Sequence, residues 1–392
     1  SKIFEFGKNG LNLISKTDTI NSLGYFYGSI TKLLGFKPHQ HEGKILGLAA
    51  YGNPNKAYKE IKKLIKYDTK SKSFKGLYDK GIYQAQYQNN NLKYLKKKYS
   101  REDICAAAQI VLEETVLKCI KHLSKKKFNI ALAGGVFANV KLNQKIMELN
   151  KVKNLFIFPN MGDGGLSVGA AVLEYFNKTN KRPKKLENYY LGLKYTEAEI
   201  IKEIKKNNLT FKKFKNLPYE IAKRISKGKV VAHFNDKMEF GPRALGNRSI
   251  LCSAKRKEIN KELNKKLNRT EFMPFAPVIM EEFLEKYFIF AKGEKNFENM
   301  TMTCRCKKIM SLSSPAAVHV DNTARPQSVS RKNNSRLYDI LNEYYEITGI
   351  PVLINTSFNL HEEPIVNSPN DAIRAYLQGN LDCLILNNFL IE

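Results

Sequence analysis

The sequence contains no apolar run long enough to cross a membrane, and its first residues, SKIFEFGKNG, lack the apolar core of a signal peptide. Its six cysteines include one close pair, Cys304 and Cys306, and no second pair that would complete a zinc site. We find no internal repeat either. These absences predict a cytoplasmic protein with free thiols, no membrane partner and no repeat architecture.

Arginine is scarce, since only 12 of the 66 basic residues are Arg. Two of them, Arg243 and Arg248, nevertheless lie in one glycine-containing loop, EFGPRALGNRSI. The planar guanidinium group holds a phosphate or carboxylate with two hydrogen bonds, whereas Lys is a point charge. Ten of the 12 Arg lie at or beyond Arg224, which predicts that the second half of the chain binds an oxyanion.

Surface salt bridges are the alternative explanation for these arginines. They would account for three of them, Arg331, Arg336 and Arg374. They explain Arg325 less well, because in VHVDNTARPQSV it directly follows a predicted apolar strand.

The formal net charge of +29 would ordinarily indicate nucleic acid or an acidic membrane surface as a partner. The charge is spread as Lys among Asn and Ile, without the interleaved aromatics of a base-stacking surface. We interpret it as a Lys-rich solvated surface, so nucleic acid is not expected as a partner.

The 392 residues, 43% of them hydrophobic, suffice for two or three domains. A helix is expected over residues 19–35, and residues 55–100 read as an excursion from the core fold. A regular pattern follows: helix 102–124, strand 128–133, helix 138–149, strand 155–158 and helix 166–177. Alternating helices, strands and Gly loops predict a parallel α/β sheet that binds ligands at the carboxyl ends of its strands.

The polar segment NKTNKRPKKLEN predicts a domain boundary near residue 185. Beyond it, the expected strands are VVAHFN, SILCSA, APVIM, AAVHV, PVLIN and DCLILN. Helices are expected near 197–206, 256–267, 333–346 and 369–378. Their irregular order predicts a second domain of mixed α+β type.

The Gly134–Gly135 pair follows a buried strand and precedes a helix, which suits close approach of a phosphate. Asn139 and Asn143 would share one face of that helix. Asp163 lies among glycines after the next strand, where its carboxylate could bind Mg²⁺ or a similar cation. An ordinary tight turn is the alternative for the glycine pair, and a helix N-cap is the alternative for Asp163. Together, the two loops suit a nucleotide and its metal.

Two further segments carry polar clusters. In HQHEGKILGLAAYG, His39 and His41 could chelate a metal, but Lys44 as a phosphate contact is the preferred interpretation. In VLINTSFNLHEEPI, Asn355 and Ser357 follow a strand and could donate to an amide-like or phosphate oxygen. A turn stabilised by these side chains is the alternative.

Seven motifs together resemble the NodU/CmcH family of O-carbamoyltransferases. They are HEGKILGLAAYG, GGVFANVKLN, GDGGLSVGAA, EFGPRALGNRSIL, PFAPVI, HVDNTARPQSV and NTSFN…EPIV, in the family's order and over nearly the whole chain. The resemblance implies an α/β chain with a partial actin-like ATPase (ASKHA) domain over residues 1–185. Residues 186–392 would be a YrdC-like α+β domain.

The resemblance also implies a two-stage reaction. The YrdC-like domain would bind carbamoyl phosphate and ATP and make carbamoyl-adenylate with loss of pyrophosphate. The actin-like domain would pass the carbamoyl group to a hydroxyl of the acceptor with the help of a divalent metal, Fe or Mg. By match to the family, the residues that clamp phosphoryl and carbamoyl oxygens are Arg243, Arg248, Arg325 and Ser357. Gly134, Gly135 and Asn139 match the nucleotide loop, and Asp163 matches a metal-ligating Asp.

Two departures from the family pattern matter. Family members begin with a further segment that carries a metal motif of the form HHxxH, which is not found here. The metal site is therefore expected to be incomplete, unless the missing N-terminal segment or a partner chain supplies the rest. The second departure is at NRTEFMPFAP, where two basic residues are expected. One is replaced by Leu267, just before this segment, and the other by Met273, within it. Lys265, Lys266 or Arg269 could substitute for them.

The sequence thus predicts an ATP-dependent O-carbamoyltransferase that acts on a small-molecule hydroxyl acceptor, of a sugar or secondary metabolite. An enzyme of tRNA threonylcarbamoylation and a nucleotide-binding scaffold without turnover are the alternatives.

Overall fold

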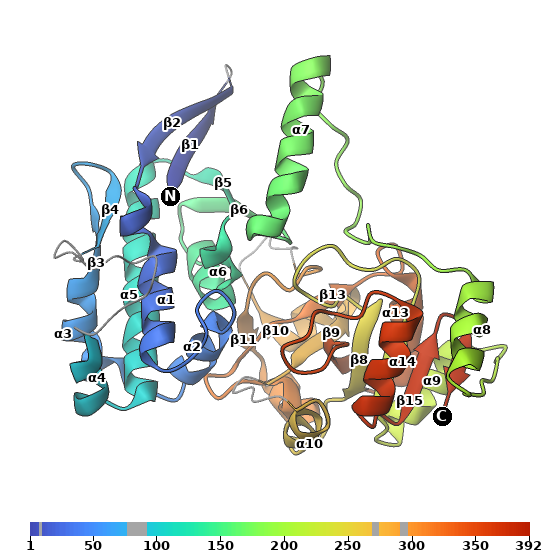
Figure 1. Cartoon of the computed structure of the whole chain (residues 1–392). Helices are drawn as coiled ribbons and strands as arrows, with labels where there is room; N and C mark the ends of the chain where they lie inside the picture. Colours follow the sequence, from blue (N-terminus) through green and yellow to red (C-terminus); the bar gives the residue numbers. More distant parts are fainter. Residues whose placement is uncertain (8–9, 77–91, 269–273, 291–296) are drawn as a thin grey trace. The chain divides into compact units, whose positions relative to one another are not determined.

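The structure, a computed structural model, describes residues 1–7, 10–76, 92–268, 274–290 and 297–392. The chain divides into two units, Ser1–Phe156 and Ile157–Glu392, so the predicted boundary near 185 falls within the second unit (Figure 1). Within the described ranges, no helix combines the length and the apolar character that crossing a bilayer requires.

The first unit is built around one long helix, α5 (Arg101–Leu123). Ser100 caps its first turn by accepting from the Asp103 backbone N–H at 3.1 Å. Four helices pack against α5: α1 (Leu23–Leu33), α2 (Glu42–Ala49), α3 (Pro54–Ile61) and α6 (Val140–Met147). A shorter helix, α4 (Lys93–Lys98), precedes it.

The strands of this unit form three two-stranded sheets. The pairs are β1 (Lys2–Gly7) with β2 (Gly10–Lys16), β3 (Ile65–Asp68) with β4 (Ser73–Gly76), and β5 (Phe128–Leu132) with β6 (Val152–Ile157). The order helix, strand, Gly loop, helix, strand, Gly loop, helix from residue 101 onward is confirmed. In the described residues β5 and β6 pair with no further strand, so the actin-like assignment stays a prediction.

The excursion expected over residues 55–100 contains the β3–β4 hairpin and helices α3 and α4. Its residues 77–91 lie outside the described residues.

The second unit contains a mixed seven-stranded sheet in the order β13-β9-β14-β8-β7-β15-β16. β13 is parallel to β9 and β7 to β15, and the other neighbours are antiparallel. The strands are β7 (Val231–Phe234), β8 (Arg248–Ser253), β9 (Ala276–Met280), β13 (Gln327–Val329), β14 (Val352–Ser357), β15 (Cys383–Leu386) and β16 (Phe389–Ile391). The prediction of a mixed α+β second domain is confirmed.

Helices and a smaller sheet complete the second unit (Figure 1). The helices are α7 (Leu166–Thr179), α8 (Glu197–Lys206), α9 (Leu217–Ser226), α10 (Ile259–Lys266), α11 (Leu284–Tyr287), α12 (Lys308–Ser313), α13 (Ser335–Thr348) and α14 (Pro369–Gln378). The smaller sheet joins β10 (Phe288–Ile289), β11 (Cys304–Cys306) and β12 (Thr323–Ala324).

The main core of this unit lies between the sheet and the helix pair α9 and α13. Leu217, Ile221 and Ile225 on α9 and Leu337, Ile340, Leu341 and Tyr344 on α13 belong to one buried cluster with Val231, Leu251, Val278, Val329 and Leu353 of the strands. Because side chains alternate along a strand, this cluster identifies the sheet face that the two helices cover.

One predicted strand is wrong. AAVHV, residues 316–320, forms no strand, and its first residues belong to a short 3-10 helix, Pro315–Ala317. The run is apolar in composition, but Val320 is 59% exposed and does not belong to the core. The strand in this region is instead β12, two residues long.

Candidate functional site

Polar side chains gather at one end of the face that α9 and α13 cover. On β7, β8 and β14, the core residues Val231, Leu251 and Leu353 are each followed or preceded at a spacing of two by a polar residue on the same face. These polar residues are His233, Ser249 and Asn355. The register pairs His233 with Ser249 and Ser249 with Ser357, so the polar positions of neighbouring strands are aligned.

The loop Glu239–Arg248, which contains the two predicted arginines, is folded around one carboxylate. Oε1 of Glu239 accepts hydrogen bonds from the backbone N–H groups of Leu245, Asn247 and Arg248 at 2.7, 2.8 and 3.1 Å. Glu239 is only 3% exposed. The loop is therefore closed on itself by the buried side chain of its first residue.

The same loop is fixed to the polar end of the sheet. Nδ1 of His233 lies 2.6 Å from the Gly246 carbonyl oxygen, and the Gly246 N–H donates to Oγ of Ser249 at 2.9 Å. Burial lowers the pKa of His233 to about 4, so its ring is neutral near pH 7. Because a carbonyl oxygen only accepts, Nδ1 carries the ring proton and donates it to Gly246.

Two buried amides extend this attachment. Nδ2 of Asn355 donates to Oε1 of Gln327 at 2.6 Å and to the Ala244 carbonyl at 3.2 Å. Nε2 of Gln327 donates to the Leu245 carbonyl at 2.7 Å. Oδ1 of Asn355 is buried and accepts no hydrogen bond from the part of the chain that the structure describes. This pair of amides connects the loop, β13 and β14.

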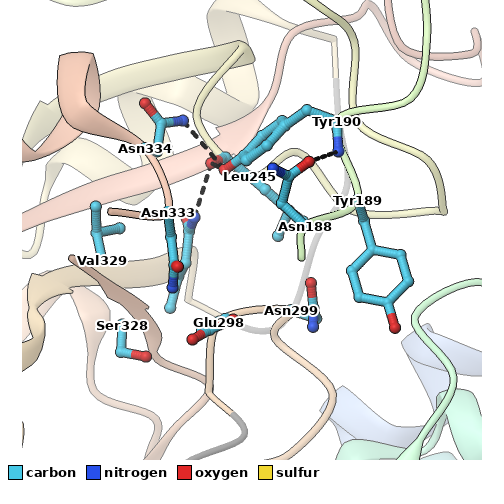
Figure 2. A pocket seen from close by; sticks show the side chains of 11 residues that line it. Asn188, Tyr189, Tyr190, Leu245, Glu298, Asn299, Ser328, Val329, Asn333 and Asn334 are labelled. Carbon is cyan, nitrogen blue, oxygen red and sulfur yellow. Dashed lines mark hydrogen bonds between the residues drawn. The ribbon is translucent and has the colours of Figure 1, made fainter. Parts of the chain in front are cut away.

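A small pocket of about 20 Å³ opens beside the loop, with room for a water molecule (Figure 2). The hydroxyl of Tyr190 donates to the Leu245 carbonyl at 2.9 Å, and Nδ2 of Asn334 donates to that hydroxyl at 3.1 Å and to Oδ1 of Asn247 at 3.0 Å. Burial is the main cause that raises the pKa of Tyr190 above its usual range, so this group stays protonated. The pocket wall therefore provides a further attachment for the loop.

Three of the predicted site residues lie next to these attachments. Arg243 directly precedes Ala244, Arg325 lies two residues before Gln327, and Ser357 lies two residues after Asn355 on the same strand face. All three predicted residues are half-buried. The amide pair and the loop thus bring together the three segments that carry Arg243, Arg325 and Ser357.

Arg248 has a different environment from the one predicted. It is fully buried, and its guanidinium carbon lies 3.5 Å from the centre of the Phe234 ring. Nη1 donates to the carbonyls of Asn235 and Asn247 at 2.8 and 2.9 Å. Nη2 donates to the Asp236 carbonyl at 3.1 Å and to the Leu193 carbonyl at 3.4 Å. Burial lowers its pKa to about 10, which leaves it charged at pH 7. This placement favours a role in holding backbone and not in clamping a phosphate.

The surface arginines agree partly with the salt-bridge alternative. Arg331 pairs with Asp339 at 2.9 Å and Arg374 with Glu363 at 2.8 Å. Arg336 donates instead to a side-chain amide at 2.9 Å.

In the first unit, the Gly134–Gly135 loop is exposed, and a Cβ added at either position would meet nothing within 4 Å. Gly134 has a φ of 112°, which favours glycine. This loop can therefore be approached closely by a ligand.

Asn139, by contrast, is used inside the first unit. Its Oδ1 caps α6 by accepting from the Leu142 N–H at 3.0 Å, and its Nδ2 donates to Oε1 of Gln109 at 2.8 Å. The same Gln109 oxygen accepts from the hydroxyl of Tyr27 at 2.8 Å. These contacts explain Asn139 as a helix cap and an interior polar contact, a role that was not predicted for it from the sequence; its nucleotide contact stays a prediction.

Lys44 lies on α2 and is 8% exposed, with Nζ 5.9 Å from the centre of the Phe36 ring. His39 and His41 flank Gln40 at the start of α2, where Nδ1 of His41 accepts from the Lys37 N–H at 3.2 Å. The phosphate contact predicted for Lys44 stays a prediction.

Asp163 is exposed in the 3-10 turn before α7. Across the described ranges, no group of three or more His, Cys, Asp or Glu residues could hold a metal ion. The divalent metal, whose site was expected to be incomplete in this chain, stays a prediction, and we derive no step through one. Packing explains the two glycines that follow Asp163, since a Cβ at Gly164 or Gly165 would lie within 2.5 Å of an Asn160 atom.

Of the residues that depart from the family pattern, Leu267 is buried at 1% exposure and Lys266 donates to the Asn380 carbonyl at 2.5 Å. Arg269 and Met273 lie outside the described residues.

Sequence reasoning missed Glu239, His233 and Gln327. Each is a polar residue in or beside an apolar segment, and that signal was available in EFGPRALG, VVAHFN and PQSV. Buried polar residues of this kind require hydrogen-bond partners. The partners of His233 and Gln327 lie far from them in the sequence, at Gly246 and Leu245, so the sequence did not identify them.

The comparisons with known proteins identify the family. Residues 2–172 match the family model described as Carbamoyltransferase N-terminus, and residues 222–392 match Carbamoyltransferase C-terminus. The chain belongs to the carbamoyltransferase family, and the resemblance to NodU/CmcH-type proteins is confirmed. The loop and amide pair described above lie in the part that the C-terminal model matches.

Individual relatives agree with this assignment. The chain is 38% identical to protein MJ1058 of Methanocaldococcus jannaschii, over 95% of this chain and 62% of that protein. It is 32% identical to nodulation protein NolO of Bradyrhizobium diazoefficiens, over 95% of this chain and 69% of that protein. It is 26% identical to 3'-hydroxymethylcephem-O-carbamoyltransferase of Streptomyces clavuligerus, over 87% and 63%. The chain thus spans about two thirds of the length of these relatives.

Among solved structures, full-length HypF in a phosphate- and nucleotide-bound form is similar, with a TM-score of 0.32 and 20% identity. The similarity covers 46% of this chain and 22% of that one.

Proposed function

We propose that this protein is an ATP-dependent O-carbamoyltransferase that forms carbamoyl-adenylate in its second unit. The carbamoyl group would then pass to a hydroxyl of a sugar or secondary metabolite. The observation that carries the proposal is the loop Glu239–Arg248, which is fixed on several sides and has Arg243 half-buried within it. One relative, from Streptomyces clavuligerus, is named for O-carbamoyl transfer.

The chemistry explains why a rigid arginine would be useful. Carbamoyl phosphate gives up its phosphate to water, and an oxygen of the resulting carbamate displaces pyrophosphate from the α-phosphorus of ATP. Negative charge moves between phosphoryl oxygens during both steps. A guanidinium group that is already in position stabilises that charge without reorganisation.

The neighbours of Arg243 suit the remaining polar atoms of the substrates. Asn355 has a buried acceptor, Oδ1, that receives no hydrogen bond within the described chain. Such an acceptor suits an N–H donor, and the carbamoyl group carries an NH₂. Ser357 and Arg325, on adjoining segments, would donate to carbamoyl or phosphoryl oxygens.

The test is the release of pyrophosphate from ATP in the presence of carbamoyl phosphate. Arg243→Lys, which keeps the charge but loses the planar fork, should lower the rate on the order of a hundredfold. Arg331→Lys is the matched control, because Arg331 is 65% exposed and pairs with Asp339 on the surface. Unchanged turnover of Arg243→Lys would remove the assigned role. ATP binding by the wild type without pyrophosphate release would favour a scaffold.

The net charge of +29 favours one second candidate, an enzyme of tRNA threonylcarbamoylation. Tight tRNA binding whose logarithm falls steeply with the logarithm of salt concentration would support it. Weak binding with a shallow slope would support the small-molecule acceptor.

A further inference from the structure

Three backbone N–H groups of the loop Glu239–Arg248 converge on a single oxygen atom. Oε1 of Glu239 lies 2.7 Å from the nitrogen of Leu245, 2.8 Å from that of Asn247 and 3.1 Å from that of Arg248. Concavities made of neighbouring N–H groups commonly bind an external anion such as phosphate. Here the anion is a carboxylate of the chain itself, so these three donors are not available to a substrate.

The loop also carries the side chain of Arg243, the cation that the proposed function assigns to an anion. This residue lies four positions after Glu239 and two before Leu245, and therefore inside the segment that the carboxylate closes. Directly after Arg243, the Ala244 carbonyl is held by Nδ2 of Asn355, and the next residue, Leu245, donates its N–H to Glu239. The backbone that follows Arg243 is thus constrained by buried groups.

We infer that Glu239 is a positioning residue for Arg243: its buried carboxylate sets the loop backbone so that the guanidinium group meets the anionic co-substrate. The inference rests on the proposed function. In this arrangement the backbone N–H groups of the loop bind an internal carboxylate, and the side chain of Arg243 binds the external anion.

A neutral amide would not replace this carboxylate. In Glu239→Gln, the amide oxygen could accept the three N–H groups, but the NH₂ group would take the place of Oε2. Oε2 is buried and accepts no hydrogen bond in the described residues, where an NH₂ would need an acceptor. The Gln side chain is therefore expected to turn or shift, and the loop to shift with it.

The test measures kcat and KM for carbamoyl phosphate, by pyrophosphate release, in the wild type, Glu239→Gln, Arg243→Lys and the double variant. Glu239→Gln should lower kcat at least tenfold. The double variant should be about as slow as Arg243→Lys alone, because residues that act through one another are not additive. Glu262→Gln, which changes an exposed carboxylate paired with Arg256, is the control and should keep its activity.

Amide hydrogen exchange gives a readout that does not depend on activity. The N–H groups of Leu245, Asn247 and Arg248 should be protected in the wild type and should exchange at least tenfold faster in Glu239→Gln. Rate losses that multiply independently in the double variant, or full activity of folded Glu239→Gln, would overturn the inference while leaving the proposed function in place. A wild type that releases no pyrophosphate would instead overturn the proposed function, and the positioning role with it.

Discussion

Asn355 on β14 and Gln327 on β13 meet through a hydrogen bond of 2.6 Å although the strand β9 lies between their strands. The residue of β9 paired with Asn355 is Ala276, which is small and buried. A small side chain there leaves room for two long amides to meet above it. The amide pair then holds the carbonyls of Ala244 and Leu245 and fixes the loop over the sheet.

Removing this amide should destabilise the second unit. Asn355→Ala leaves Oε1 of Gln327 and the Ala244 carbonyl without their donor, which should cost ~1–3 kcal/mol of unfolding free energy. Urea denaturation measures the change. Asn154→Ala, which removes an exposed amide contact to Asn129 in the first unit, should cost less than ~0.5 kcal/mol. Equal losses of unfolding free energy in the two variants would contradict the stabilising role of the buried amide pair.

Gly246 should tolerate no side chain. Its φ is +116°, and an added Cβ would lie 2.5 Å from Cδ2 of Leu337 and 3.1 Å from Nδ2 of Asn334. Gly246→Ala combines backbone strain with a clash in the core, so we expect a loss of ~2–4 kcal/mol. Gly349→Ala has a positive φ of 69° but no atom within 4 Å, and should lose only ~1 kcal/mol. Thermal unfolding of the pair would show equal losses if the packing around Gly246 were unimportant.

His233 should make stability depend on pH. Its pKa is lowered from 6.5 to about 4 mainly by burial. Between these values the unfolded chain binds a proton that the folded protein does not, so the contribution is complete above pH 6.5 and is lost as the pH falls toward 4. The total is about 3 kcal/mol.

The comparison for this effect is His233→Asn, whose amide can still donate to Gly246. Unfolding free energies at pH 7.0, 5.5 and 4.5 should fall more steeply in the wild type than in the variant, because other titrating groups are common to both. Parallel curves would show that His233 is not buried in its neutral form.

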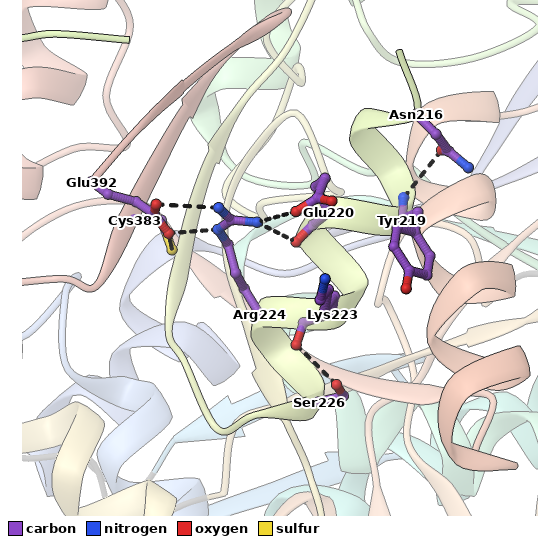
Figure 3. Close-up of polar contacts among 8 residues, drawn as sticks. All are labelled: Asn216, Tyr219, Glu220, Lys223, Arg224, Ser226, Cys383 and Glu392. Atoms are coloured by element: carbon purple, nitrogen blue, oxygen red, sulfur yellow. Dashed lines mark hydrogen bonds and ion pairs between the residues drawn. The ribbon is translucent and has the colours of Figure 1, made fainter. Parts of the chain in front are cut away.

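Arg224 connects α9 to Glu392, the residue that directly follows β16 (Figure 3). Nε and Nη2 donate to the two carboxylate oxygens of Glu392 at 2.5 and 3.1 Å, and Nη1 donates to Oε2 of Glu220 at 2.6 Å. The hydrogen bonds to Glu392 are the main cause that raises the pKa of Arg224, which is 16% exposed.

Arg224→Ala should therefore lower the unfolding free energy by ~1–3 kcal/mol, because a two-oxygen pairing and its packing are lost. Arg256→Ala is the matched control, since Arg256 also contacts both oxygens of one carboxylate, that of Glu262, but is 58% exposed. It should change stability by less than ~1 kcal/mol. A greater loss for Arg256→Ala, measured by urea denaturation, would contradict this account.

The sequence predicted those parts of the fold whose signals are local. The helices α8 and α14 have the predicted bounds, and each begins with a capping box, at Thr196 and Ser368. α9 was missed although Asn216 caps it and Leu217, Ile221 and Ile225 share one face. Its length equals that of α8 and α14, so the signal was present in the sequence and was overlooked.

The motifs predicted which segments meet at the site, but not the environment of each side chain. The segments of Arg243, Arg325 and Ser357 do come together, as three motifs in one half of the chain suggested. The burial of Arg248 depends on its register opposite Phe234, and that of Asn139 on Gln109, which lies on another helix. The closure of the loop by Glu239 depends on a carboxylate folding back onto its own chain, which no spacing rule indicates.

The most direct test of the central claim is a calorimetric titration of carbamoyl phosphate into the wild type and Arg243→Lys, with thermal unfolding of both proteins. We predict that the variant binds at least tenfold more weakly at a temperature at which the unfolding curves show both proteins folded, because the proposed role of Arg243 is to hold the ligand. Equal affinity of the two proteins would contradict the claim that the fixed loop presents Arg243 to an anionic substrate.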